Sequence, residues 1–211
     1  MSIKYILSKF LQKIQLPSIR DSYIYKNSAI SSRSHVVNSR IKNYSYVGVD
    51  CTIVNSEIGK FCSIANNVVI GGAEHPKSWV STSPVFHEGK NILKKNFSDH
   101  TYSPTKKTII MNDVWIGNHC LIKSGVKICN GAIIGMGSVV TKDIGPYEIW
   151  AGNPAKLIKK RFSQNIINEL ERIQWWNFSE FNLEVYAEYS NDVEKFIENV
   201  ERGFYENSSL G

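Results

Sequence analysis

Residues 110–140 read IMNDVWIGNHCLIKSGVKICNGAIIGMGSVV, and an aliphatic residue returns at every sixth position of this stretch. A helix has a period of 3.6 residues and a strand a period of two, so neither element alone produces this spacing. A period of six fits short strands joined by tight corners, with one inward aliphatic side chain for each strand. The aliphatic positions are Ile110, Ile116, Ile122, Ile128, Ile134 and Val140.

A second series with the same period lies earlier in the chain, with two steps of five residues. It comprises Ile24, Ile30, Val36, Ile41, Val47, Ile53, Ile58, Ile64 and Ile70. A small residue stands two positions before most members of both series, at Ser22, Ser28, Ser34, Ser39, Ser45, Cys51, Ser56, Cys62, Cys120, Ala132 and Ser138. One repeat buries too little apolar surface to be stable alone, so the repeats must stack to form a core. We therefore predict a β-solenoid over residues 19–162, with three strands to a coil if the coils are triangular.

Composition indicates a globular protein. Of the 211 residues, 42% are hydrophobic and 21% are charged, and the net charge of +6 suits an anionic small molecule, a nucleic acid or a membrane surface. The four cysteines form no CxxC pair and no zinc spacing. We interpret them as reduced packing residues of a cytoplasmic protein. No apolar run is long enough to span a bilayer, so we expect no integral membrane segment.

Both ends of the chain have helical patterns. In residues 1–18 the apolar side chains follow a helical period and alternate with lysines, at Ile3, Ile6, Leu7, Phe10, Leu11 and Ile14. This helix either docks on the main body or contacts a membrane surface weakly. Residues 163–211 form a predicted helical tail, with Ser163 as a helix cap and one stripe at Ile166, Ile167, Leu170, Ile173 and Trp176.

The repeat is lost for about forty residues between Ile70 and Ile110, and a long insertion in a solenoid is usually functional. The insertion, residues 71–109, contains Gly71-Gly72-Ala73-Glu74-His75-Pro76, then Ser81-Thr82 and Pro84-Val85-Phe86. Together with Tyr44-Ser45-Tyr46 and Gly152-Asn153-Pro154-Ala155-Lys156, it resembles the hexapeptide-repeat acyltransferases. It closely resembles the xenobiotic branch, which includes chloramphenicol and streptogramin acetyltransferases, and it also resembles related polysaccharide O-acetyltransferases. The resemblance covers roughly residues 20 to 200.

The resemblance implies an all-β fold, a left-handed parallel β-helix with a long protruding loop and a C-terminal α-helical tail. It also implies that His75 is the catalytic base and that Tyr44 and Tyr46 help to form the acceptor pocket. Trp79 and Phe86 either pack the loop or line that pocket, and His100 is the best candidate for a further pocket residue. Glu74 could orient the imidazole of His75, although adjacency in sequence does not establish contact.

Acetyl-CoA is the cosubstrate that the resemblance implies, and the basic group after Gly152 matches the end of its groove. Cations there would meet the nucleotide phosphates, although such a group is also compatible with a solvated face. The candidate residues for this groove are Trp115, Gly135, Thr141, Lys142, Asn153, Pro154, Lys156, Lys159 and Arg161. Backbone N–H groups near Trp115 or Gly135 could stabilise the oxyanion. Family members assemble as homotrimers with active sites between subunits, so we expect the same here.

A histidine that titrates near neutral pH can take the proton of an attacking sugar hydroxyl, so we predict direct O-acetylation of a sugar in surface polysaccharide synthesis. N-acylation of a nucleotide-linked amino sugar and acetylation of an antibiotic remain alternatives. A carbonic-anhydrase-type metal enzyme would need three convergent histidines, and only His35 and His119 lie on repeats. We interpret His35, His87 and His119 as surface residues. We expect no resident metal and no nucleic-acid partner.

Overall fold

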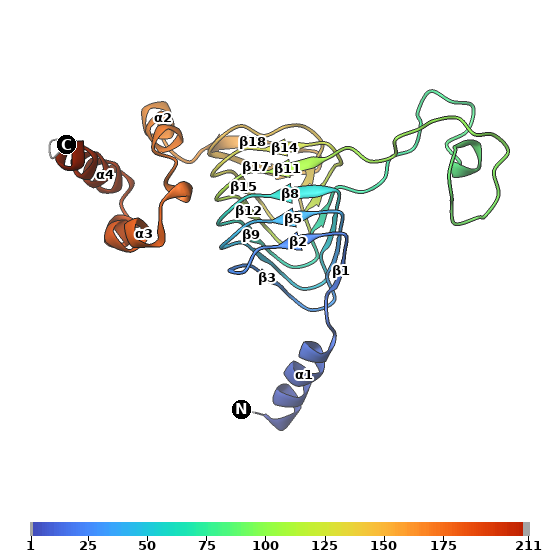
Figure 1. Cartoon of the computed structure of the whole chain (residues 1–211), viewed down its shortest axis with the longest axis horizontal. Helices are drawn as coiled ribbons and strands as arrows, with labels where there is room; N and C mark the ends of the chain where they lie inside the picture. The colour runs from blue at the N-terminus through green and yellow to red at the C-terminus, as the bar shows by residue number, and fades with distance from the viewer. Residues whose placement is uncertain (1, 209–211) are drawn as a thin grey trace.

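The computed structural model describes residues 2–208, apart from the side chains of residues 12, 13 and 204–208. Eighteen strands form three sheets that make the three walls of a β-helix (Figure 1). Sheet 1 contains β1 (Ser18–Arg20), β4 (His35–Val37), β7 (Thr52–Val54), β10 (Val69–Ile70), β13 (Leu121–Ile122) and β16 (Val139–Val140). Sheet 2 contains β2 (Tyr23–Ile24), β5 (Arg40–Ile41), β8 (Ser56–Ile58), β11 (Thr108–Ile110) and β14 (Lys127–Ile128). Sheet 3 contains β3 (Ala29–Ile30), β6 (Tyr46–Val47), β9 (Ser63–Ile64), β12 (Trp115–Ile116), β15 (Ile133–Ile134), β17 (Glu148–Gly152) and β18 (Ala155–Lys160).

Neighbouring strands are parallel except for β17 and β18, and the register places one repeat position on the next. In sheet 1, Val36 pairs with Ile53 and Ile53 with Ile70. Ile70 then pairs with Ile122, so the stack continues across the insertion without a shift. Thirteen of the fifteen predicted aliphatic positions are fully or almost fully buried, and the first two, Ile24 and Ile30, are partly buried at the open end. The periodic pattern therefore predicts the inward-facing residues correctly.

Counted from β2, three coils precede the insertion and two follow it, as the repeat numbers predict. The structure extends the solenoid at both ends, because β1 pairs with β4 below and β17 pairs with β15 above. The small residues also point inward. Ser34, Ser45 and Cys62 are buried, and the Ser34 and Ser45 hydroxyls donate to carbonyl groups of the next coil at 2.8 and 2.7 Å. These bonds satisfy polar atoms at the corners, where space is smallest.

The helical tail packs on the corner between sheets 2 and 3. It consists of α2 (Gln164–Ile173), a 3₁₀ turn at Trp175–Asn177, α3 (Glu180–Tyr186), a second turn at Ala187–Tyr189, and α4 (Val193–Ser208). The side chain of Ser163 caps α2 by accepting a hydrogen bond from the backbone N–H of Ile166. Ile167 and Leu170 form a small core with Tyr147 of the solenoid. Residues 209–211 of the predicted tail lie outside the described residues.

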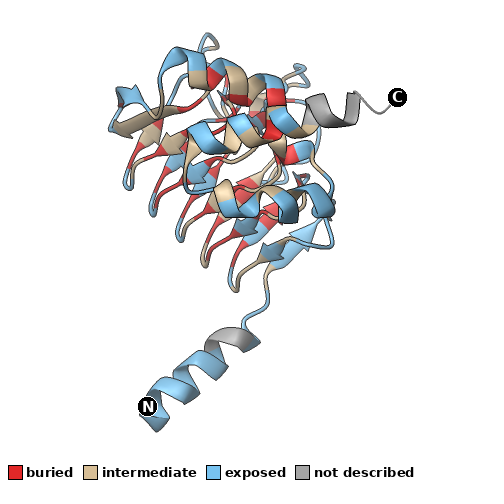
Figure 2. Cartoon of the chain, turned by 90° about the vertical axis from the view of Figure 1, so that its left-hand side faces the viewer, coloured by how far each residue is buried: buried red, intermediate tan, exposed pale blue. Residues whose placement is uncertain are grey.

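The N-terminal helix, α1 (Ile3–Ile14), lies away from the solenoid beyond its first coil (Figures 1 and 2). Its apolar residues are exposed, so the docking on the main body that the sequence allowed is not made within this chain. Among residues 2–208, no helix combines the length and the apolar character that crossing a bilayer requires. All four cysteines are free thiols, and Cys51, Cys62 and Cys120 are buried as predicted.

Candidate functional site

The insertion leaves the solenoid at the corner between sheets 1 and 2. Three earlier coils turn this corner on a left-handed residue, Asp21, Asn38 or Asn55. In the fourth coil the corresponding residue is Gly71, with φ of +79°, and the chain then runs outward to residue 107 as a protruding loop (Figure 1). A Cβ at Gly71 would collide with the carbonyl oxygen of Val54. Glycine is therefore required where the loop departs.

The loop is fastened to the solenoid close to His75. The Glu74 carboxylate lies 3.1 Å from the Lys123 ammonium, on the coil that follows the loop. The backbone N–H of Glu74 donates to the carbonyl oxygen of Pro104 at 2.6 Å, which joins the outgoing and returning arms of the loop. Lys123 lowers the pKa of Glu74, so this carboxylate is ionised at neutral pH. The structure thus gives Glu74 an anchoring partner other than His75.

His75 is exposed, and its Nδ1 lies 2.8 Å from the carbonyl oxygen of Thr82. A carbonyl oxygen can only accept a hydrogen bond, so Nδ1 must carry the proton in this contact. In the neutral imidazole the lone pair is then on Nε2. The loop therefore selects the tautomer in which Nε2 can accept a proton from a bound molecule.

Aromatic rings pack around Trp79 in the loop that carries His75. Trp79 makes edge contacts with His87, His100 and Tyr102, with ring centroids 5.2, 5.6 and 5.7 Å apart. His87 is buried and its Nε2 has no hydrogen-bond partner among the described residues, so its interpretation as a surface residue is wrong. The His87 ring centroid lies 6.5 Å from that of His75. The sequence around His87 does not predict this packing, because the partners of His87 come from both arms of the loop.

A cavity of about 670 Å³ opens beside this cluster. It is lined by Ser78, Trp79, Val80, Ser81, Phe86, His100 and Thr101. The loop thus brings together three residues that the sequence suggested for acceptor binding: Trp79, Phe86 and His100. Phe86 also packs against Phe97, with ring centroids 5.9 Å apart, so it serves packing as well as lining. The volume and the mixed aromatic and hydroxyl lining are typical of small-molecule sites.

Tyr44 and Tyr46 are not part of this cluster. Tyr44 stacks on Phe61 at 4.8 Å and donates a short hydrogen bond to Glu180 of α3, on the side of the solenoid away from the loop (Figure 1). The Glu180 carboxylate raises the pKa of the Tyr44 hydroxyl. Tyr46 is exposed on the outer face of sheet 3. Within one chain, neither tyrosine reaches the loop.

The residues suggested for acetyl-CoA lie in the last coils. Trp115 is 52% exposed on the outer face of sheet 3, which excludes a core position. Thr141 and Lys142 are exposed after β16, and Asn153 and Pro154 form the tip of the β17–β18 hairpin. Lys156 and Lys159 are exposed on β18 with no ion pair among the described residues. Gly135 is a packing position, because a Cβ there would lie 2.9 Å from the Cβ of Ala151.

Arg161 does not join these free cations. Its Nη1 lies 3.0 Å from the Asp113 carboxylate and donates to the carbonyl oxygen of Gly131 at 2.7 Å. Its guanidinium also lies over the rings of Tyr147 and Phe162, at 5.3 and 5.2 Å. Arg161 therefore holds the start of the tail on the solenoid, and its place in the coenzyme groove stays a prediction. The sequence could not reveal this partner, because Asp113 lies on another coil.

The backbone N–H groups suggested for an oxyanion are also occupied. The N–H of Trp115 donates to the Ala132 carbonyl at 3.0 Å, and that of Gly135 donates to the Trp150 carbonyl at 2.8 Å. Both belong to the ladder between coils. A solenoid uses these groups for its own stacking, so neither is available to a tetrahedral intermediate.

Comparison with known proteins agrees with this architecture. Residues 107–142 match the family model "Bacterial transferase hexapeptide (six repeats)". A probable macrolide acetyltransferase of Lysinibacillus sphaericus is 44% identical over 124 residues, which cover 58% of this chain and 69% of that protein. The chain belongs to the hexapeptide-repeat acetyltransferases.

Other members of this family match over similar lengths. A chloramphenicol acetyltransferase of Klebsiella aerogenes is 42% identical over 125 residues, covering 58% of this chain and 59% of the relative. The match to the chloramphenicol enzymes thus spans less than two thirds of their length. The N-acyltransferase AntD of Bacillus cereus, solved with dTDP-4-amino-4,6-dideoxyglucose and coenzyme A, superposes with a TM-score of 0.52 at 21% identity, over 79% of this chain and 96% of AntD. That likeness concerns the fold.

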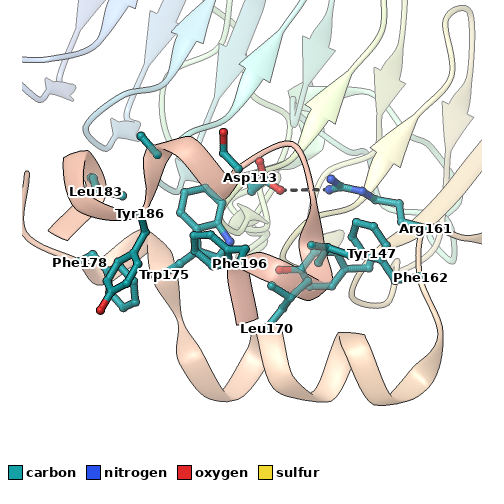
Figure 3. Close-up of a pocket in the computed structure, with 13 residues that line it drawn as sticks. Asp113, Tyr147, Arg161, Phe162, Leu170, Trp175, Phe178, Leu183, Tyr186 and Phe196 are labelled. Carbon is teal, nitrogen blue, oxygen red and sulfur yellow. Dashed lines mark hydrogen bonds and ion pairs between the residues drawn. The ribbon is translucent and has the colours of Figure 1, made fainter. Parts of the chain in front are cut away.

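A second cavity, of about 370 Å³, lies between the tail and the solenoid (Figure 3). Its walls are mostly aromatic and aliphatic, including Trp175, Tyr186 and Phe196, with the Arg161–Asp113 pair at one side. No histidine lines it. Among the described residues, no group of three His, Cys, Asp or Glu side chains is arranged to hold a metal ion.

Proposed function

We propose that this protein is an acetyl-CoA-dependent O-acetyltransferase that modifies a sugar hydroxyl, with His75 as general base. The family and its relatives, which are named as acetyltransferases, support the reaction class. The observation that carries the proposal is the 2.8 Å contact between His75 Nδ1 and the Thr82 carbonyl, in the same loop that forms the aromatic cavity.

In the proposed mechanism, Nε2 of His75 accepts the proton of the acceptor hydroxyl while its oxygen attacks the thioester carbonyl carbon. The carbon–sulfur bond then breaks, and the imidazolium returns the proton to the departing sulfur. Thr82 stabilises the imidazolium, because its carbonyl dipole points at the Nδ1 proton throughout. Trp79 and His100 would position the acceptor in the cavity, with Phe86 as its apolar wall. Acetyl-CoA supplies the acetyl group.

The sugar acceptor is supported by chemistry and by a relative. A hydroxyl loses its proton only during attack, so its acetylation depends on a positioned base, whereas an amine can lose its proton to water beforehand. Galactoside O-acetyltransferase of Escherichia coli is 36% identical over 130 residues, which cover 60% of this chain and 56% of that enzyme. We propose surface polysaccharide synthesis as the context of this reaction.

Coenzyme A fits the exposed face of the last coils better than it fits the loop. Lys156 and Lys159 have no ion pair among the described residues and can meet phosphates, and the exposed indole of Trp115 offers a stacking surface. The Asn153–Pro154 tip borders this face, whereas Lys142 follows β16 at the corner between sheets 1 and 2. Because the loop protrudes away from the solenoid, we propose a homotrimer in which His75 of one subunit serves coenzyme A bound partly by another.

Antibiotic acetylation is the second candidate, and sequence similarity favours it. The chloramphenicol and macrolide relatives are 40–44% identical to this chain, against 36% for the galactoside enzyme.

The test is release of coenzyme A in the presence of acetyl-CoA and one acceptor from each class: a galactoside, a nucleotide-linked amino sugar, chloramphenicol and a macrolide. We expect turnover with the galactoside and an ester that mild alkali removes. An alkali-stable amide on the amino sugar, or turnover with the antibiotics alone, would replace the proposed acceptor. Absence of turnover when no acceptor is added is the control for simple hydrolysis.

A further inference from the structure

The helix α1 has one apolar side that nothing in the described chain covers. Ile3, Leu7, Phe10 and Ile14 follow each other at steps of three or four residues, and Ile6 and Leu11 widen the stripe. Each of these six side chains is more than half exposed, with Phe10 at 61%. Burying such a stripe is favourable by about 1.5–3 kcal/mol for each large side chain. A stripe of this kind therefore calls for a partner.

That partner is not the rest of the chain. The helix stands clear of the solenoid in two perpendicular views (Figures 1 and 2). The residue after the helix, Gln15, does contact the solenoid. Arg33 donates to its backbone and side-chain oxygens at 3.2 and 3.3 Å. Gln15 thus fixes the end of the segment, while the apolar stripe before it stays free.

Charge distinguishes a lipid surface from a protein. The first twenty residues contain four basic residues, Lys4, Lys9, Lys13 and Arg20, and the first acidic residue is Asp21. Lys4 and Lys9 are exposed, and the 100° spacing of a helix places them off the apolar stripe. A basic polar side beside an apolar side matches the boundary of an anionic bilayer, where each lysine contributes about 1 kcal/mol.

A second copy of the chain is a poorer match. Its α1 carries the same lysines, so pairing two copies of this helix would bring Lys4 and Lys9 of each toward those of the other. Twelve residues provide fewer than two heptads, which is short for a helix pair in water. The same length, about 18 Å of helix, is too short to cross the bilayer.

We propose that α1 is a peripheral membrane anchor. It lies in the plane of an anionic bilayer surface with Ile3, Leu7 and Phe10 among the acyl chains and with Lys4 and Lys9 at the lipid phosphates. The anchor is independent of acetyl transfer, and it holds the solenoid beside the membrane without inserting any other element.

The experiment is co-sedimentation of the full chain with vesicles of phosphatidylcholine alone or mixed with phosphatidylglycerol. We expect binding to the mixed vesicles that decreases as salt rises, and little binding to the neutral ones. Lys4→Gln with Lys9→Gln should weaken binding by about 25-fold, since each lysine accounts for about 1 kcal/mol. Leu7→Ser with Phe10→Ser should weaken it at least tenfold.

Matched controls use exposed residues elsewhere: Lys26→Gln with Lys127→Gln for charge, and Leu157→Ser with Ile158→Ser for apolar area. These should bind vesicles as the unchanged protein does. Equal binding by the α1 variants would overturn the proposal. So would loss of subunit association or a lower melting temperature of the α1 variants without vesicles, because α1 would then be covered by protein. Acetyl transfer in solution, measured separately, should not change.

Discussion

At the scale of single residues, the proposal rests on His75 as the general base. Its exposure, the protonated Nδ1 and the free Nε2 are the properties that a general base needs. We expect His75→Ala to fold normally and to lose about two to four decades of kcat. Steady-state rates of coenzyme A release by the two proteins measure this loss.

The matched variant is His35→Ala, which removes an exposed histidine from the outer face of sheet 1. It should retain full activity. Normal turnover by folded His75→Ala protein would remove His75 from the mechanism.

Cys62 offers a second test at this scale, directed at the core. Burial raises the pKa of its thiol to about 12. An unfolded thiol titrates near 8.5, so the stability that protonated Cys62 contributes is complete below about pH 8.5 and is lost as pH rises toward 12. Cys62→Ser should fold well, because Ser45 occupies the equivalent position one coil below.

Urea denaturation at pH 7.5 and pH 10.5 measures this effect. The unchanged protein should lose about 3 kcal/mol more unfolding free energy than Cys62→Ser between these values. Equal losses would mean that the thiolate is already accommodated in the fold.

At the scale of elements, the attachment of the tail depends on Asp113 and Arg161. Burial raises the pKa of Asp113 although Arg161 lies beside it, so the ionised carboxylate is not fully compensated. Asp113→Asn keeps an acceptor for Arg161 and removes this cost, and we expect it to stay within about 1 kcal/mol of the unchanged stability. Arg161→Ala leaves the carboxylate unpaired and should cost about 2 kcal/mol, less than a fully buried pair because water reaches both groups.

Thermal and urea unfolding distinguish these two variants. Arg172→Ala serves as the comparison, because it removes surface ion pairs with Glu169 and Glu201 and should cost under about 1 kcal/mol. If Asp113→Asn lost more unfolding free energy than Arg161→Ala, the claim that the buried Asp113 carboxylate is incompletely compensated would be wrong.

The elements also separate what the sequence could predict from what it could not. Strand positions such as Ile53 and Ile122 follow from a local period, so the sequence identifies them without knowledge of the fold. Ser163 was found in the same way, since a cap is a local feature. Other features depend on residues that are distant in sequence, so no local spacing predicts them. These are the burial of His87, the pairing of Arg161 and the occupied N–H groups of the coils.

On the same scale, β18 supplies the exposed cations of the proposed coenzyme groove. We expect Lys156→Gln with Lys159→Gln to raise KM for acetyl-CoA, with a larger effect at low salt, and to change kcat little. Initial rates at several salt concentrations provide the measurement, and Lys90→Gln with Lys94→Gln is the matched pair. A raised KM for the acceptor alone would place the groove elsewhere.

At the scale of the whole molecule, the loop and the last coils do not form one closed site within a single chain. The loop protrudes on one side of the solenoid, whereas β18 closes its last coil (Figure 1). If neighbouring subunits complete the site, His75→Ala subunits and Lys156→Gln/Lys159→Gln subunits have complementary defects. When the two are unfolded together in equal amounts and refolded, about a quarter of the sites should combine an intact His75 with intact lysines. Rates at low acetyl-CoA should then exceed the average of the two separate proteins, and light scattering should report three subunits. A mixed sample that shows only the average rate would mean that both groups act within one chain.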